Sequence, residues 1–255
     1  MWNPDLYLKY KDERTQPSYD LVSRINLPNP EKIVDIGCGP GNSTRVLRER
    51  WPRAQVAGLD SSAEMIQTAR EAYPQETWIM SDAAQWETDE KFDIVFSSAA
   101  LQWIPDHTVL IPKLFDRVKP GGVLAVQVPS NHRSPLHQAV LKVSKKKEWS
   151  QLMAGCETRL NYHEPGFYYE LLAAISRQFT LWQTTYYHVL DNHQGLVDWY
   201  SSTGMRPYLE RLATDAEKNA FREQVLEACR PFYPAQSNGK ILFPFNRLFF
   251  LASHE

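Results

Sequence analysis

The chain has 255 residues, of which 43% are hydrophobic and 23% are charged, a composition that excludes a disordered protein. Its formal net charge is -2, so it lacks the basic surplus typical of nucleic-acid-binding proteins. Aromatic residues reach 12% of the chain, more than a core of this size needs, and we expect many of them to line a binding pocket.

The three cysteines, Cys38, Cys156 and Cys229, are far apart, which favours neither a disulfide framework nor a zinc site. We therefore expect a reduced, cytoplasmic setting and no bound metal. The polar N-terminal residues do not resemble a signal peptide, and no apolar run is long enough to span a membrane. We expect a soluble protein that acts on neither membranes nor nucleic acids.

Strand-like and helix-like segments alternate through the first half of the chain. Strands are expected at residues 32–36, 55–59, 77–80, 92–97 and 123–128. Helices are expected at residues 42–50, 63–72 and 109–118, the last of them ending at the sequence KPGG. Because apolar, β-branched strands alternate with helices, the pattern predicts an α/β fold with a parallel sheet covered by helices on both faces.

The pattern changes after residue 129. Helices are expected at 135–147 and 166–177, followed by a strand at 179–188. A charged helical stretch at 194–230 should break at Gly204 and Pro207, and a last strand at 240–251 should be interrupted by Pro244. No repeat or low-complexity linker separates the halves, which favours one domain with a helical elaboration.

A glycine-rich loop is the most specific motif in the sequence. Residues 33–43 read IVDIGCGPGNS and place Gly37, Gly39 and Gly41 between a strand and a helix. Glycine permits positive φ and close approach of a ligand, and the helix that follows offers unpaired N–H groups. A dinucleotide fingerprint would need glycine at position 42, which is Asn. Asp35 inside the motif suits a positively charged cofactor better than a pyrophosphate, and a turn without a ligand is the weaker alternative.

Two further carboxylates follow predicted strands. Asp60 ends the second strand, where a carboxylate commonly accepts hydrogen bonds from ribose hydroxyls. It could instead cap the next helix, a role for which Ser61 and Ser62 compete. Asp82, after the third strand, suits the amine of adenine, with the N–H of Ala83 beside it. A solvated turn aspartate is an equally weighted alternative.

Four segments, VDIGCGPGNS, AGLDSSAEMI, SDAAQW and FDIVFSSAALQWIPDH, resemble the class I S-adenosylmethionine-dependent methyltransferases over about the first 130 residues. The segments WNPDLYLKYKDERTQP, LQWIPDH, GGVLAVQVPSN, TTYYH, STGMRPYL and NGKILFPFNRLFF are similar to the trans-aconitate 2-methyltransferase family over nearly the whole chain. The resemblance is poorest at residues 142–164.

The resemblance implies a Rossmann-like, seven-stranded, mostly parallel sheet with a reversed last strand, helices on both faces and a helical cap. It implies a single methyltransferase domain over residues 1–255, with an N-terminal helical lid at 1–30, a cofactor-binding core at 31–130 and a substrate-side elaboration at 131–255. The implied cofactor is S-adenosylmethionine. Its candidate binding residues are Asp35, Gly37, Gly39, Gly41, Asp60, Ser61, Asp82, Ala83 and Ser98.

The implied reaction transfers a methyl group to a carboxylate of a small tricarboxylic acid, giving a monomethyl ester and S-adenosylhomocysteine. A carboxylate is already ionised at neutral pH, so no general base is needed, and positioning and desolvation can carry catalysis. We therefore predict no catalytic acid or base. Gln102 and Trp103, after the fourth strand, are the candidates for positioning, although Trp103 could simply pack under the next helix.

The acid should be recognised by cations and hydroxyls, and arginine matches a carboxylate with two parallel hydrogen bonds. The candidate substrate-binding residues are Arg206, Arg247, Tyr186, His188, Tyr7 and Arg14. Each has a structural alternative: surface charge for Arg206, a structural ion pair for Arg247, and packing for the tyrosines. Methyl transfer to a hydroxyl, amine or carbon, or cofactor binding without turnover, are the alternative functions.

Overall fold

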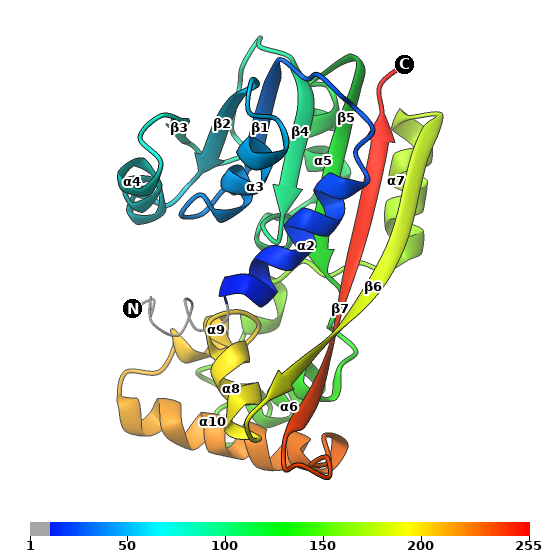
Figure 1. The fold of residues 1–255 in the computed structure, drawn as a ribbon. Helices are drawn as coiled ribbons and strands as arrows, with labels where there is room; N and C mark the ends of the chain where they lie inside the picture. The colour runs from blue at the N-terminus through cyan, green and yellow to red at the C-terminus, as the bar shows by residue number, and fades with distance from the viewer. Residues whose placement is uncertain (1–10) are drawn as a thin grey trace. The chain divides into compact units, whose positions relative to one another are not determined.

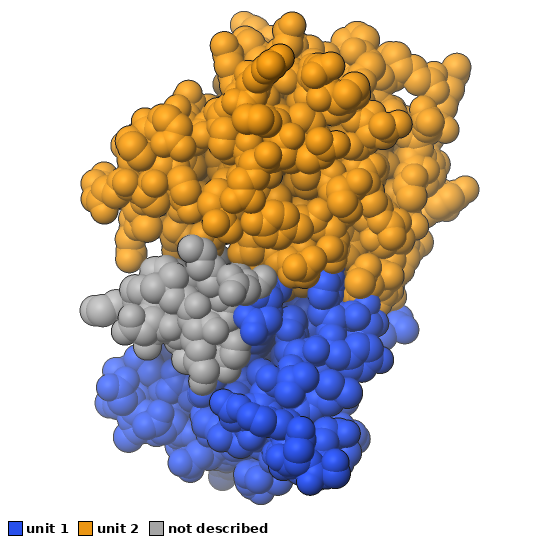
Figure 2. All heavy atoms as spheres, viewed as in Figure 1, with its two compact units in different colours: residues 1–14, 130–160, 185–246 blue, residues 15–129, 161–184, 247–255 orange. Residues whose placement is uncertain are grey.

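The structure is a computed structural model that describes residues 11–255, with side chains described from Glu13 onward. The chain divides into two compact units (Figure 2). Unit 2 holds residues 15–129, 161–184 and 247–255, and the described part of unit 1 holds residues 11–14, 130–160 and 185–246. The predicted cofactor-binding core, residues 31–130, falls in unit 2 except for its last residue. Organisation of the whole chain as a single domain stays a prediction.

A seven-stranded sheet has the order β3-β2-β1-β4-β5-β7-β6 (Figure 1). Its strands are β1 (Lys32–Ile36), β2 (Gln55–Asp60), β3 (Thr77–Met80), β4 (Phe92–Ser98), β5 (Val118–Pro129), β6 (Gln178–Leu190) and β7 (Ile241–Ser253). Strands β1 to β5 pair in parallel, whereas β7 pairs with β5 in the antiparallel direction. The predicted α/β fold with a reversed last strand is confirmed. The strand order reverses between β1 and β4, which is where open α/β sheets bind their ligands.

Helices of unit 2 cover both faces of the sheet. They are α2 (Lys11–Ser23), whose first four residues belong to unit 1, α3 (Asn42–Arg50), α4 (Ala63–Ala72), α5 (His107–Phe115) and α7 (Pro165–Ile175). On one face, α5 and α7 pack in an apolar cluster with strand residues such as Val34, Val95 and Phe250. This cluster is the core of unit 2, and it leaves the opposite face of the sheet to α2, α3 and α4.

That opposite face becomes polar where the strands end. Asp35 of β1 accepts a hydrogen bond of 2.6 Å from Ser43 of α3. Ser98 of β4 accepts one of 3.0 Å from Ser18 of α2. Polar side chains therefore join both helices to the carboxyl ends of the central strands.

Unit 1 packs four helices with the outer parts of β6 and β7. The helices are α6 (Pro135–Ser144), α8 (Gln194–Ser201), α9 (Arg206–Leu209) and α10 (Asp215–Cys229). Its core contains fully buried aromatic side chains, among them Trp199, Phe221 and Phe243. His137 of α6 is also buried, and its Nδ1 shares a hydrogen bond of 2.8 Å with the hydroxyl of Tyr200.

The structure corrects the predicted helix at 109–118. Helix α5 ends at Phe115, and the KPGG segment lies inside β5. The register between β4 and β5 shifts between Phe92 and Ile94, so a bulge takes up the extra residues. The strand therefore begins at Val118, five residues before the predicted start at residue 123.

Two predicted proline interruptions are also wrong. Pro207 lies in the first turn of α9, where a helix tolerates proline because those N–H groups have no partner within the helix. Strand β7 continues through Pro244, which lies outside the segment paired with β5, because that pairing begins only at Arg247. The predicted break at Gly204 is confirmed, because it falls between α8 and α9.

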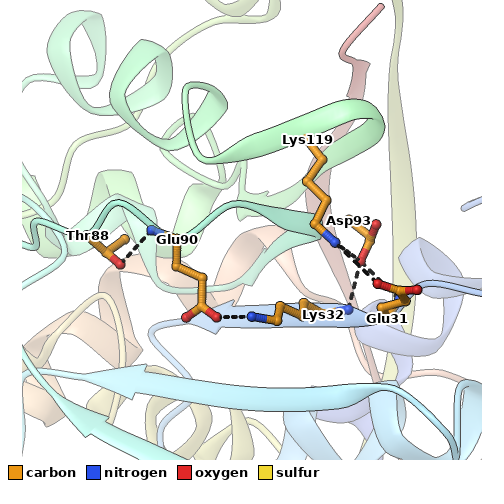
Figure 3. Close-up of polar contacts among 6 residues, drawn as sticks. All are labelled: Glu31, Lys32, Thr88, Glu90, Asp93 and Lys119. Atoms are coloured by element: carbon orange, nitrogen blue, oxygen red, sulfur yellow. Dashed lines mark hydrogen bonds and ion pairs between the residues drawn. The ribbon is translucent and has the colours of Figure 1, made fainter.

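A cluster of charged residues joins the amino ends of β1 and β4 (Figure 3). Oδ2 of Asp93 accepts hydrogen bonds from the backbone N–H groups of Glu31 and Lys32, at 3.0 and 2.7 Å, and from Nζ of Lys119 at 3.0 Å. Burial alone would raise the pKa of Asp93, but these hydrogen bonds outweigh burial and hold that pKa below its usual value. Lys32 also pairs with Glu90. The cluster stabilises the amino ends of these strands, opposite the carboxyl ends at which we expect a ligand to bind.

Candidate functional site

The glycine loop joins β1 to α3 in unit 2. Gly37, Gly39 and Gly41 have φ values of +72°, +54° and +91°, in the left-handed region that favours glycine. The loop is anchored to β2, because the N–H groups of Gly37 and Cys38 both donate to the carbonyl of Leu59, at 2.7 and 3.0 Å. The sequence motif thus forms a tight, fixed turn at the end of β1.

The three glycines differ in the space around them. A Cβ at Gly37 would lie 2.1 Å from the Cβ of Ala100, and a Cβ at Gly41 would lie 2.8 Å from the ring of Tyr73. A Cβ at Gly39 would meet no atom of the described residues within 4 Å. Packing therefore requires glycine at the two outer positions, while Gly39 borders open space in which a ligand can approach the backbone.

Cys38 is the buried residue of this loop. Its side chain is 3% exposed, and Sγ donates to the carbonyl of Gly39 at 3.6 Å. Burial raises the pKa of the thiol, and the charges of Asp35 and Asp60 raise it further. The thiol is therefore protonated at neutral pH.

Asp60 holds the glycine loop from the end of β2. Its Oδ2 accepts the N–H of Gly39 at 2.9 Å, and its Oδ1 accepts the N–H of Ser62 at 2.9 Å. Ser62, rather than Asp60, caps α4, since its Oγ accepts the N–H of Met65. Each carboxylate oxygen can accept a second hydrogen bond, so Asp60 can fix the loop and still receive ribose hydroxyls.

Asp35 is fully buried beneath the same loop. Oδ2 accepts hydrogen bonds from Ser43 and Thr44 at 2.6 and 2.7 Å, whereas Oδ1 has no hydrogen-bond partner within residues 11–255. Burial raises the pKa of Asp35 to about 6, although the two hydroxyls lower it. A buried acceptor without a donor is unfavourable, and a cationic ligand group would supply the missing partner.

The remaining cofactor candidates lie around the ends of β2 and β3. Asp82 is exposed, and its Oδ1 accepts the N–H of Ala84 at 2.9 Å. Ala83 is buried and Ser61 is exposed. Asp82 therefore stabilises the turn after β3. A contact between Asp82 and adenine stays a prediction.

The loop after β4 carries the two positioning candidates. Ala99 follows Ser98 with a φ of +56°, a strained conformation for alanine. Gln102 is buried, and its Nε2 donates to the carbonyl of Ala99 at 2.6 Å. Trp103 is 37% exposed. Gln102 therefore stabilises the strained turn, and the contribution of Trp103 to the reaction stays a prediction.

Sequence reasoning missed His107, which supports this loop from α5. Its Nε2 donates to the carbonyl of Leu101 at 2.8 Å, and its Nδ1 accepts the hydroxyl of Tyr168 at 2.8 Å. Burial lowers the pKa of His107, so the ring is neutral. The sequence shows a histidine near LQW, but its partner Tyr168 lies 61 residues away and no local motif marks the pair.

Three of the six predicted substrate-binding residues gather around Trp199 in unit 1. The guanidinium of Arg14 lies 5.2 Å from the centroid of the Trp199 ring, and its Nη2 donates to Oγ of Ser202 at 2.9 Å. His188 stacks on Trp199 with a centroid distance of 4.2 Å, and Tyr186 stacks beside His188 at 6.5 Å. Trp199 and Ser202 were not predicted.

The other three candidates lie apart from this group. Arg206 is exposed at the start of α9, and its Nε donates to Glu210 at 2.7 Å. Arg247 belongs to unit 2 and is 4% exposed, and its Nη1 donates to Oε1 of Gln127 at 3.3 Å. Tyr7 lies outside the described residues.

Solved structures share this architecture. YcgJ from Bacillus subtilis matches with a TM-score of 0.61 at 14% identity, covering 94% of this chain and 99% of that one. A putative methyltransferase from Bacillus halodurans matches with a TM-score of 0.59 at 15% identity, covering 93% and 98% of the two chains. These likenesses concern the fold. Together with the glycine loop and its carboxylates, the fold defines a class I S-adenosylmethionine-dependent methyltransferase.

Sequence relatives identify the family. Residues 33–122 match the family described as "Methyltransferase domain". The trans-aconitate 2-methyltransferase of Azoarcus sp. (strain BH72) is 44% identical over 251 residues, 98% of each chain. The enzyme of that name from Escherichia coli O157:H7 is 40% identical over 251 residues, covering 98% of this chain and 97% of that one. The chain belongs to the trans-aconitate 2-methyltransferase family, and its cofactor is S-adenosylmethionine.

The described residues fit this cofactor. The space at Gly39 admits a ligand against the backbone, and Asp60 offers carboxylate acceptors beside it. Two buried acceptor atoms, Oδ1 of Asp35 and Oε1 of Gln102, have no hydrogen-bond partner in the part of the chain that the structure describes. A cofactor that carries a sulfonium and an ammonium group complements such acceptors.

We expect Asp60→Ala to weaken binding of S-adenosylhomocysteine by on the order of 1–3 kcal/mol, because ribose hydrogen bonds are lost and the loop loses an anchor. Titration calorimetry measures the affinity. In the same experiment, Asp82→Ala separates its two roles, since a loss of affinity indicates a contact with adenine and an unchanged affinity indicates a turn residue. An unchanged affinity for the Asp60 variant would remove Asp60 from the site.

Proposed function

We propose that this protein transfers the methyl group of S-adenosylmethionine to a carboxylate of trans-aconitate, forming a monomethyl ester and S-adenosylhomocysteine. The observation that carries the proposal is the identity of 44% over 98% of the chain to a relative named trans-aconitate 2-methyltransferase. That similarity spans the substrate-side half as well as the cofactor-binding core, so it bears on the acceptor too.

The methyl donor needs no further activation, because the bound cofactor supplies a methyl group attached to a sulfonium. The chain has to hold the two reactants in line and exclude water. Asp60 and the glycine loop bind the nucleoside part of the cofactor. Oδ1 of Asp35, which has no partner among the described residues, interacts with a cationic group of the cofactor. Gln102 stabilises the loop that follows β4, where we expect the acceptor to be positioned.

No residue has to remove a proton from the acceptor. The carboxyl groups of a tricarboxylic acid have pKa values well below 7, so the nucleophile is already ionised. Burial lowers the pKa of His107, and hydrogen bonds to Tyr168 and Leu101 engage both of its ring nitrogens. His107 therefore supports the loop and is not available as a base. We therefore expect little dependence of kcat on pH near neutrality.

Incubation with labelled S-adenosylmethionine and a panel of organic acids tests the proposal. A base-labile ester of trans-aconitate is the expected product. If no di- or tricarboxylate yields an ester, the proposal fails. Transfer to a hydroxyl or amine, with a rate that rises with pH through a base near neutrality, would identify a different acceptor class.

A small organic acid is the proposed partner, and a cytoplasmic setting is the proposed location. The three cysteines are free and buried, which supports a reducing environment. No helix within residues 11–255 has both the length and the apolar character needed to cross a membrane.

Arg206→Ala is expected to raise KM for the acid by about tenfold, because loss of a contact between guanidinium and carboxylate costs on the order of 1–3 kcal/mol. Cofactor affinity should not change. Arg230→Ala is a matched control, since Arg206 and Arg230 both have side chains that are 47% exposed and both pair with a glutamate three or four residues away. Equal KM values for the two variants would make Arg206 a surface residue only.

A further inference from the structure

Four polar residues share one face of the sheet in unit 2. The strand register and the alternation of side chains place them there, and they are Asp35 of β1, Ser98 of β4, Gln127 of β5 and Arg247 of β7. We call this set the polar row. Three of its members are at most 4% exposed, and Ser98 is half-buried. The row begins with an acid beneath the glycine loop and ends with a guanidinium, so its charge changes sign along the sheet.

Gln127 lies in the middle of the polar row and is fully buried. Its Oε1 accepts hydrogen bonds from Oγ of Ser98 at 3.2 Å and from Nη1 of Arg247 at 3.3 Å. A guanidinium can only donate, so the atom of Gln127 that faces Arg247 must be the oxygen. The orientation of the amide is therefore fixed, and Nε2 lies on the other side.

Nε2 of Gln127 carries two N–H groups and has no hydrogen-bond partner among the described residues. Glutamine in an interior strand is itself unusual, and a buried N–H without an acceptor is unfavourable unless a ligand supplies one. The backbone carbonyl of Gln127 also receives the N–H of Ala99 at 3.0 Å, so the residue is tied to the strained turn before Gln102. Gln127 is thus a rigid donor beside the loop expected to hold the acceptor.

We propose that Gln127 is a specificity-determining residue whose Nε2 donates to a carboxylate of the acid that is not methylated. Ser98 and Arg247 fix its amide so that the donor side faces the acid. The proposal rests on the function proposed above and assigns it a residue that neither the sequence nor the family resemblance indicated. The change of charge along the polar row supports this proposal, because the cationic cofactor is expected near Asp35 and the anionic acid is expected nearer to Arg247.

Gln127→Glu is the decisive variant. Its carboxylate keeps acceptor oxygens for Ser98 and Arg247 but removes the N–H groups, so a merely structural role would survive the change. We expect KM for trans-aconitate to rise roughly tenfold or more, and Kd for the acid, measured by calorimetry with S-adenosylhomocysteine present, to rise in parallel. Kd for S-adenosylhomocysteine alone should stay within about twofold.

Gln183→Glu is the matched control, because it adds the same charge at an exposed position of β6 in unit 2. It should leave all three constants unchanged. Gln127→Met removes the donor and the acceptor together. Its melting temperature shows how far the structural contacts matter, while the Glu variant keeps the test valid if the Met variant unfolds.

Two outcomes overturn the proposal. An unchanged KM and Kd for the acid in Gln127→Glu would make Gln127 purely structural, and a raised Kd for S-adenosylhomocysteine would assign its donor to the cofactor instead. Selectivity gives a second measure: the preference of the wild type for a tricarboxylate over an unsaturated dicarboxylate should shrink in the variant. If the wild type esterifies no acid, the proposed function fails, and the calorimetric Kd still tests the contact.

Discussion

Alanine at Gly37 is expected to lower the free energy of unfolding by about 3 kcal/mol or more, from strain at positive φ and from overpacking. The new Cβ would lie 2.1 Å from the Cβ of Ala100. At Gly39 the same change should cost only about 1 kcal/mol in stability, because no atom of the described residues lies within 4 Å of the new methyl group. It should nevertheless raise Kd for S-adenosylhomocysteine by on the order of 100-fold, because the methyl group fills the space at the loop backbone.

Urea unfolding and titration calorimetry separate these two effects. Gly239→Ala is the control for backbone strain alone, since Gly239 has a φ of +79° and no atom within 4 Å of an added Cβ, and it lies in unit 1. It should match Gly39→Ala in stability and the wild type in cofactor affinity. Normal binding by Gly39→Ala would mean that the cofactor does not approach the loop at this point.

Acidification below pH 6.5 is expected to destabilise the protein through His137. Burial lowers the pKa of His137 to about 4, and the neighbouring His132 adds to the effect. In the unfolded chain the histidine pKa is about 6.5, so between pH 6.5 and pH 4 the unfolded chain is protonated at this residue and the folded chain is not. Through this residue, the free energy of unfolding should fall by about 3 kcal/mol as the pH is lowered from 6.5 to 4.

The variant His137→Asn keeps a polar side chain near Tyr200 but cannot titrate in this range. Asp35 acts in the opposite direction, because burial raises its folded pKa to about 6 and its contribution to stability falls as the pH rises from 3.8 to 6. The informative quantity is therefore the difference in unfolding free energy between wild type and variant at each pH. Parallel curves from pH 7 to pH 4 would show that His137 is not the group responsible.

The sequence predicted the cofactor-binding core well, because its signals are local. The segment IVDIGCGPGNS contains a strand, a turn with three glycines at positive φ and a helix start within eleven residues. Asp60 and Asp35 were found by their spacing from that turn. The structure adds what spacing does not show, namely that Asp60 holds the loop through the N–H of Gly39 and that one oxygen of Asp35 is already engaged.

The features that sequence reasoning missed depend on partners far along the chain. Gln127 and Arg247 are 120 residues apart, and Arg14 and Trp199 are 185 apart. No local pattern distinguishes Gln127 or Trp199 from an ordinary strand or helix position, whereas Arg247 and Arg14 were candidates because arginine matches a carboxylate. The bulge before Ile94 was missed for a similar reason, since it arises from the pairing of two strands rather than from either one.

Only some of the aromatic residues that exceed the needs of a core are expected to line a binding pocket. Tyr168, Phe249 and Phe250 are fully buried, with Phe249 stacked on Trp182 at 5.1 Å and Phe250 packed against Tyr168 at 5.4 Å. These rings fill the core of unit 2. The group around Trp199, with Arg14 over its ring, remains the part of the surplus that we expect to contact a ligand.

The state of Cys38 has a consequence for how the enzyme responds to its chemical surroundings. Oxidants and alkylating reagents attack the thiolate, and burial together with two nearby carboxylates keeps this sulfur in the thiol form. Cys38, in the centre of the glycine loop, is therefore a poor target for oxidants and alkylating reagents. The loop can carry a small, polarisable side chain against Trp78 without becoming a point of oxidative inactivation.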